Sequence, residues 1–369
     1  MSAPVLPSET RSPRLADFAF GPRQHRSAAE LPEPDSSLEM WWRAVALGGT
    51  GHYAAARIAL RRLQASTGDP VLLSLAASTE GSLRRQLGRH ARAAHDDGHA
   101  AALVLPRLPG APASGQWSAE PIDPNSPGRC RRSSRLADAD PAGGASAGAV
   151  SAGGVAGCAE HPGPADTCAA GFYRVPDLVD AAADALTGLA ADALGTGRLA
   201  LATRLLDRCG ALLDAELPSG PMRSGAARGG GSEAAVDRSR ALVRLHWVRA
   251  ETALAGGRAD EALAAAEIAL GLAEHGPSIR HTVKSRLLVA AAAGVTGDTA
   301  RAAELAALVD EQCRESGLLP LRWACAMLRT GLPASAAEPA AGHASAAADA
   351  EACRALISRR GGRFRDSGR

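Results

Sequence analysis

The chain has 369 residues, of which 46% are hydrophobic and only 3% aromatic, and its formal net charge is +2. So few aromatic side chains argue against a β-sandwich, whose core relies on aromatic and β-branched residues, and favour closely packed helices. A net charge this small produces no strong field of either sign, so the charge does not indicate a nucleic-acid-binding protein.

The use of residue types indicates the source and the compartment. Lys284 is the only lysine, and alanine and glycine are abundant, which is typical of the codon bias of a high-GC bacterial genome. The longest apolar run, Leu287 to Val295, is far shorter than the roughly 20 residues that span a bilayer. No secretory signal follows Arg11 or Arg14, and the seven cysteines are scattered without a CxxC pair. We therefore expect a reduced, cytoplasmic protein with no membrane contact.

The first third of the chain contains a tail and two expected hairpins. Residues 1–35 are rich in Pro, Ser and Arg without helical periodicity, so we expect a disordered N-terminal tail. Residues 36–105 show helical periodicity and predict the first two helical hairpins. Ser36 and Glu39 have the spacing of a capping box, which marks the start of the first helix.

The rest of the chain continues the same array after an interruption. Residues 106–172 are dominated by Pro, Gly and Ser, and we expect a disordered insertion that loops out of the array. Residues 173–330 predict three further hairpins and a capping helix from Leu319 to Leu328, in the same solenoid as 36–105 because two hairpins cannot bury their apolar faces alone. Residues 331–369 predict an Ala-rich linker and a basic disordered tail, with a short helix near 352–357.

A recurring pair of residues marks the turn of each expected hairpin. A glycine is followed five residues later by an alanine that opens an Ala/Leu-rich stretch. Glycine can adopt the backbone conformation of the turn, and a methyl-sized side chain in the second helix lets the first helix approach closely. The pairs are Gly51/Ala56, Gly88/Ala93, Gly197/Ala202, Gly257/Ala262 and Gly297/Ala302.

These hairpins resemble tetratricopeptide repeats. Residues 51–56 read Gly-His-Tyr-Ala-Ala-Ala and match the family's turn pattern of glycine, aromatic and alanine, whereas 257–262 and 297–302 match it without the aromatic residue. The family period is ~34 residues, and the copies here are longer and degenerate. The resemblance covers 36–105 and 173–330, and it implies an all-α solenoid of about five hairpins with a groove that holds a partner.

The resemblance also implies which residues face the groove. They fall at the family's second, fifth, ninth and twelfth positions on the first helix of each hairpin. Cations and tryptophans in such a groove would suit an acidic or C-terminal peptide with an apolar anchor. The alternative is that the tryptophans belong to the core and the cations are solvated. Counted back from the turn glycines, the candidates are Trp41, Arg85, Arg244, Trp247, Glu251, Leu254 and Lys284.

Other candidate sites favour simpler interpretations. His95 and His99 have i, i+4 spacing and could bind a transition metal, but no third ligand is fixed beside them, so we interpret them as part of a solvated helix face. The arginine clusters at 129–132 and 359–369 could contact nucleic acid or anionic lipid, and we interpret them as solvated tails. The sequence contains no nucleophile elbow, phosphate loop or dinucleotide fingerprint, so we expect no catalytic residue, no cofactor and no metal.

The sequence therefore predicts a non-enzymatic protein–protein interaction module that binds a peptide or a partner helix in a helical-repeat groove. We expect the partner to be another protein or peptide, with nucleic acid unlikely. One alternative is a regulatory sensor or docking subunit for a transcriptional or signalling partner on another chain. A second alternative is a metal-dependent enzyme around His95 and His99.

Overall fold

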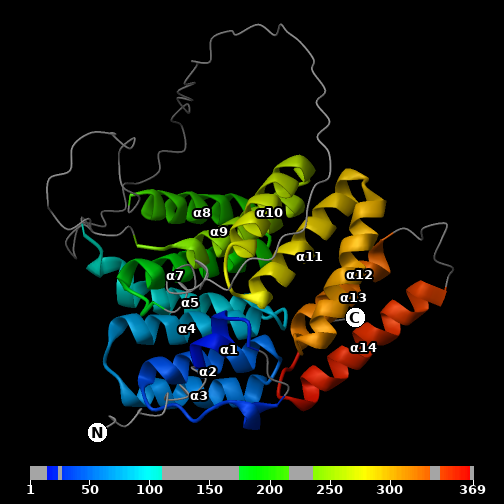
Figure 1. The fold of residues 1–369 in the computed structure, drawn as a ribbon. Coiled ribbons are helices and arrows are strands. Elements are labelled where there is room, and N and C mark those ends of the chain that lie inside the picture. Colours follow the sequence, from blue (N-terminus) through cyan, green and yellow to red (C-terminus); the bar gives the residue numbers. More distant parts are fainter. Residues whose placement is uncertain (1–14, 24–26, 110–173, 216–235, 333–340, 366–369) are drawn as a thin grey trace, which may run out of the picture. The chain divides into compact units, whose positions relative to one another are not determined.

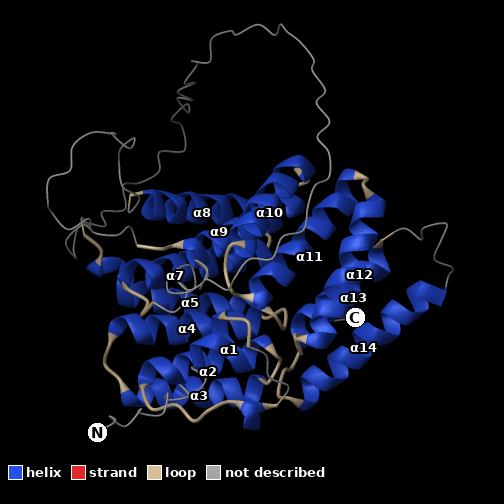
Figure 2. Cartoon of the chain, in the orientation of Figure 1, coloured by secondary structure: helices blue, strands red, loops and turns tan. Residues whose placement is uncertain are grey.

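The computed structural model describes residues 15–23, 27–109, 174–215, 236–332 and 341–365, and within these ranges the fold is all-α, as predicted (Figure 1 and Figure 2). None of the described helices is long and apolar enough to cross a membrane. Two short 3-10 helices cover Ala28–Glu30 and Leu105–Arg107. The α-helices are α1 (Leu15–Phe20), α2 (Ser37–Gly49), α3 (Tyr53–Ser66), α4 (Pro70–Arg85), α5 (His90–Val104), α7 (Leu178–Gly195), α8 (Leu199–Asp214), α9 (Ser239–Ala255), α10 (Ala259–Glu274), α11 (Ile279–Thr296), α12 (Thr299–Glu315), α13 (Leu319–Gly331) and α14 (Ala341–Arg359).

The helices pair as consecutive hairpins in a solenoid-like arrangement. The pairs are α2/α3, α4/α5, α7/α8, α9/α10, α11/α12 and α13/α14. Both helices of each hairpin pack against the first helix of the next hairpin. Helix α5 packs against α7, although the undescribed residues 110–173 separate them in sequence.

The predicted turns have the predicted backbone. All five turn glycines have positive φ, between +71° and +94°, a region that is open to glycine and strained for other residues. All five partner alanines are fully buried. A larger side chain at these alanines would push the two helices of the hairpin apart, so the glycine and the alanine act together to define each hairpin.

The N-terminal part differs from the expected disordered tail of 1–35. Residues 15–20 form α1, which packs against α2 and contacts α11. Leu15, Ala16, Ala19 and Phe20 are all buried, because the i, i+4 pairs place a continuous apolar face toward the core. A six-residue helix is too short to show a clear period in the sequence, and its stability comes from tertiary packing.

The C-terminal part contains the short helix expected near 352–357 within the longer helix α14, and otherwise differs from the linker and basic disordered tail predicted for 331–369. Helix α14 packs along α13, so α13 is half of a sixth hairpin and not a terminal cap. The side chains of α14 that are buried recur every three or four residues: Ala346, Ala350, Cys353 and Ile357. Residues 360–365 then extend along the first two hairpins, as described below. Residues 106–109 of the predicted insertion are described and include the end of the 3-10 helix Leu105–Arg107. The rest of the insertion, with the cluster at 129–132, lies outside the described residues.

The strain at one turn glycine can be measured against a matched glycine in the adjoining helix. Gly257 has φ +71° and Gly271 lies inside α10, and an added Cβ would meet nothing within 4 Å at either position. We expect Gly257→Ala to lower the free energy of unfolding by about 1–2 kcal/mol, because only the backbone conformation opposes it. Gly271→Ala should raise it by about 0.5–1 kcal/mol through helix propensity.

Urea unfolding of the two variants beside the wild type measures both effects. Equal effects of the same sign would contradict the assignment of strain to the turn.

Candidate functional site

A cavity of about 470 Å³ lies among the first helices of all six hairpins. Apolar side chains form much of its wall, and its lining is completed by residues outside these six helices: Phe20, Tyr53, Gln86, His90 and Ile357. Leu254 is not among the lining residues, because it packs in a small apolar cluster with Ala253 and Ala262. The other candidates from the sequence all line this one cavity: Trp41, Arg85, Arg244, Trp247, Glu251 and Lys284.

Trp41 and Trp247 are core residues beside the cavity, which revises their candidate role as accessible anchors. Their exposed fractions are 1% and 6%. The indole of Trp41 donates to the hydroxyl of Thr79 at 3.0 Å, and that of Trp247 donates to the hydroxyl of Ser285 at 2.8 Å. In both cases the acceptor lies 38 residues later, on the first helix of the next hairpin. Each tryptophan therefore links two successive hairpins.

The guanidinium of Arg85 lines the cavity, but two buried carboxyl groups outside the lining already balance its charge. It contacts Asp97 of α5, and its Nη1 lies 3.3 Å from the carboxylate of Asp192 of α7. Both aspartates are fully buried. Burial, with the repulsion between the two carboxyl groups, raises the pKa of Asp192 to about 8. One proton is therefore shared within the pair at neutral pH, and a single negative charge balances Arg85.

The other arginines of the cavity, Arg240, Arg244 and Arg280, lie near fewer carboxylates than Arg85 does. Asp184 of α7 lies 2.9 Å from Nη1 of Arg240 and 2.9 Å from Nε of Arg244, so one charge serves two guanidinium groups. Burial raises the pKa of Asp184, but these two arginines outweigh it and leave that pKa lowered. Arg280 donates instead to the backbone carbonyls of Val45 and Ala19, at 3.0 and 3.2 Å.

Burial and the excess positive charge lower the pKa of two of these arginines, Arg244 and Arg280. Burial and then the neighbouring charges of Arg244 and Arg240 lower the pKa of Arg280 to about 10. Burial also lowers the pKa of Arg244. The buried Nη2 of Arg240 finds no hydrogen-bond acceptor among the described residues. All three remain charged at neutral pH. Arg240 and Arg244 pair with one carboxylate and Arg280 pairs with none, which leaves an excess of two positive charges at the cavity among the described residues.

The remaining pair of candidates is neutral as a unit. The ammonium of Lys284 lies 3.2 Å from Glu251 and 4.5 Å from the ring centroid of Trp247. Beside them His281 is buried, and burial together with the adjacent cations lowers its pKa well below the usual value, which keeps the imidazole neutral. The net charge of the cavity therefore comes from Arg240, Arg244 and Arg280.

Three charged residues of the cavity were missed in the sequence, although two of them carry a signal. Arg240 and Arg244 are four residues apart on α9, and Arg280 and Lys284 have the same spacing on the first helix of the next hairpin, 40 residues later. Basic pairs at the same register of successive hairpins must lie on one face of the array. Nothing in the sequence connects the third missed residue, Asp184, with this face.

The histidine pair on α5, His95 and His99, is not part of a larger group of metal ligands among the described residues. His95 and His99 are both exposed. No group of three or more His, Cys, Asp or Glu side chains that could hold a metal ion occurs among the described residues.

Comparison with known proteins gives no assignment. No protein-family model matches this sequence, and no curated protein matches it. The chemistry of the cavity is therefore the basis for inferring a function.

The buried carboxyl pair predicts a pH-dependent stability. The raised pKa means that the folded chain holds a proton that the unfolded chain has released, so the stability from this group falls as the pH rises from about 4 toward 8. Asparagine cannot ionise. We therefore expect the free energy of unfolding of Asp192→Asn to rise relative to that of the wild type between pH 5 and 8, and the difference to stay constant above pH 8. Urea unfolding across this range measures the difference, and parallel pH profiles would contradict the shared proton.

A double variant tests the charge that remains on this pair. Either Asp97→Asn or Asp192→Asn alone leaves one carboxylate for Arg85. The variant that carries both changes leaves a buried guanidinium unpaired, which should cost about 3–5 kcal/mol of unfolding free energy. We expect the double loss to exceed the sum of the single losses by more than 1 kcal/mol, because each carboxylate replaces the other.

Proposed function

We propose that this chain is a cytoplasmic, non-enzymatic interaction module of degenerate tetratricopeptide type, whose cavity holds a short acidic segment of a partner protein. The observation that carries the proposal is a set of three guanidinium groups at the cavity with one carboxylate among them. Arg240 and Arg244 both pair with Asp184, and Arg280 donates only to backbone carbonyls among the described residues. A carboxylate-bearing ligand would supply the missing negative charge. Arginine offers paired donors that match a carboxylate geometrically.

The size and the lining of the cavity favour a short segment. Its volume of about 470 Å³ lies within the range of small-ligand pockets. A helix with its side chains has a diameter of about 10–12 Å, so a long partner helix would not enter. Apolar side chains line part of the wall, among them Leu287, Leu288 and Leu321. The preferred ligand is therefore a few residues of peptide with an acidic group and one apolar side chain.

A displayed library of short random peptides tests this specificity. We expect the wild-type chain to select acidic sequences, and synthetic copies to bind in a fluorescence anisotropy titration. Arg244→Gln should weaken the selected peptide about tenfold through the loss of a charge-assisted hydrogen bond. The variant should fold normally, because burial already disfavours the charge of Arg244 and Arg240 still pairs with Asp184.

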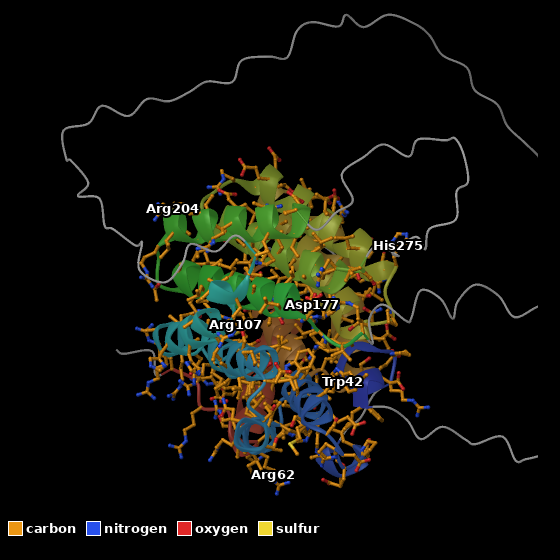
Figure 3. The ribbon with its side chains drawn as sticks, turned by 90° about the vertical axis from the view of Figure 1, so that its left-hand side faces the viewer. Trp42, Arg62, Arg107, Asp177, Arg204 and His275 are labelled. Carbon is orange, nitrogen blue, oxygen red and sulfur yellow. The ribbon has the colours of Figure 1, made fainter. Side chains whose placement is uncertain are left out.

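Arg204→Gln is the matched control. Arg204 is exposed on α8, a second helix of a hairpin, and does not line the cavity (Figure 3). Its replacement removes the same charge from the chain and should change the affinity less than twofold. Selection of neutral or basic peptides, or an equal loss in both variants, would contradict the proposed site.

The two alternatives from the sequence lack separate support in the described residues. A regulatory docking subunit would use the same cavity, and the test above would then report the motif of its partner. A metal-dependent enzyme would need a group of at least three suitable ligands around His95 and His99, and no such group occurs among the described residues.

A further inference from the structure

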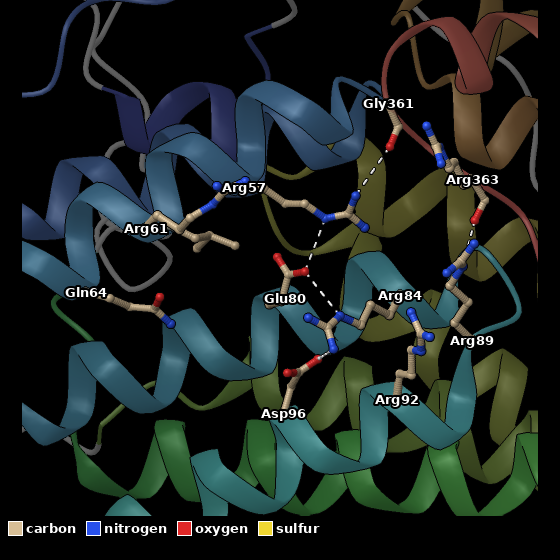
Figure 4. Close-up of a pocket in the computed structure, with 11 residues that line it drawn as sticks. Arg57, Arg61, Gln64, Glu80, Arg84, Arg89, Arg92, Asp96, Gly361 and Arg363 are labelled. Atoms are coloured by element: carbon tan, nitrogen blue, oxygen red, sulfur yellow. Dashed lines mark hydrogen bonds and ion pairs between the residues drawn. The ribbon is translucent and has the colours of Figure 1, made fainter.

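A second cavity, of about 650 Å³, lies between α3, α4, α5 and the chain after α14 (Figure 4). It shares no lining residue with the cavity described above. Helix α3 contributes Arg57 and Arg61, and α4 contributes Glu80 and Arg84. Arginine side chains supply most of its lining, so it differs in character from the first cavity.

The C-terminal segment forms one wall of this arginine cavity. The amide of Ala54 donates to the carbonyl of Arg360 at 3.0 Å, and the amide of Arg365 donates to the carbonyl of Leu87 at 2.8 Å. Between these two contacts Gly361 has φ +86°, and a Cβ there would come within 2.7 Å of the Cβ of Ala54. The segment is therefore attached at both ends to the first two hairpins, with Arg363 between them.

The arginines of this cavity outnumber its carboxylates by six to two. Glu80 accepts from Arg57 at 3.1 Å and from Arg84 at 3.2 Å, and Arg84 also lies 3.1 Å from Asp96. Arg89 donates to main-chain carbonyls of the C-terminal segment and to no described carboxylate. The structure records no ion pair between described residues for the other three: Arg61, Arg92 and Arg363.

The side chains present indicate which anion would fit. Leu60 is the one apolar side chain of the lining, and no aromatic ring lines the cavity. Proteins that hold single-stranded nucleic acid stack its bases on aromatic rings, and that platform is missing here. Guanidinium groups converging from three helices and a terminal segment suit several phosphate groups held close together.

We propose that the arginine cavity binds a compact oligophosphate, a ligand with at least two linked phosphate groups. Arg61, Arg92 and Arg363 supply the donors, because the internal carboxylates already hold Arg57 and Arg84. The ligand bridges the C-terminal segment and the first two hairpins, and it neutralises the repulsion between Arg363 and the arginines of α3 and α5. This site is independent of the proposed peptide cavity.

Inorganic triphosphate is the probe for a calorimetric titration of the full chain at 0.15 M salt. We expect it to bind at least tenfold more tightly than orthophosphate, because more than one phosphate is held. Arg61→Gln and Arg92→Gln should each weaken triphosphate about tenfold, the effect of one charge-assisted hydrogen bond. Both side chains are exposed and without a recorded ion pair, so neither variant should lose helicity in circular dichroism.

Two controls separate the site from general attraction to a basic surface. Arg62 is exposed and adjoins Arg61 on α3 but does not line the cavity, so Arg62→Gln should change the affinity less than twofold (Figure 3). Arg244→Gln, which alters the other cavity, should leave triphosphate binding unchanged. Gly361→Ala displaces the C-terminal wall and should weaken triphosphate about tenfold, as expected if Arg363 is a ligand-binding residue.

Three results would overturn the proposal. The first is the absence of binding at about 1 mM triphosphate, which corresponds to only about 4 kcal/mol of binding free energy. The second is an equal loss in Arg61→Gln and Arg62→Gln. The third is tighter binding of a ten-residue thymidine oligonucleotide with the same loss in Arg61→Gln, which would assign the cavity to a nucleic-acid backbone.

Discussion

Five of the six hairpins depend on a backbone conformation that glycine adopts without strain, followed by a side chain small enough to let two helices touch. The five positive-φ glycines and their fully buried alanines satisfy both requirements. This close approach has a consequence for the rest of the fold. Because alanine supplies little apolar area, successive hairpins need other links, and the indole–hydroxyl bonds of Trp41 and Trp247 are two of them.

The chain handles buried charge in two opposite ways. Around Arg85 the carboxyl groups exceed the guanidinium, and a shared proton removes the surplus charge. Around Asp184 the guanidinium groups exceed the carboxylate, and no proton can correct this because arginine does not release one at neutral pH. The first arrangement is closed and stabilises the contact between the second and third hairpins. The second leaves an excess of positive charge among the described residues, which is the charge that the proposed acidic ligand would balance.

The sequence predicts the hairpins and most of the candidate residues that line the cavity, because both follow from the spacing of residues along the chain. A turn glycine fixes the register of the helix before it, so six of the seven residues chosen at repeat positions line one cavity. The sequence does not predict which side chains those residues contact. The partners of Arg85 lie 12 and 107 residues away, and such pairs leave no local pattern. Of α14 the sequence predicts only the short helix near 352–357, because alanine occurs on every face of α14 and the buried stripe has little contrast with its surroundings. Helix α1 was missed because six residues are too few to show a period.

The attachment of residues 360–365 to the first two hairpins changes how this array can fold. In an open repeat protein each unit contacts only its neighbours, so folding can start anywhere and spread, and the ends can fray alone. Here the guanidinium of Arg360 donates to the carbonyl of Thr50, across 310 residues of sequence. The first two hairpins therefore complete their surface only after residues 360–365 have been synthesised. Because each of these segments covers backbone groups of the other, we expect the first two hairpins and residues 360–365 to unfold together.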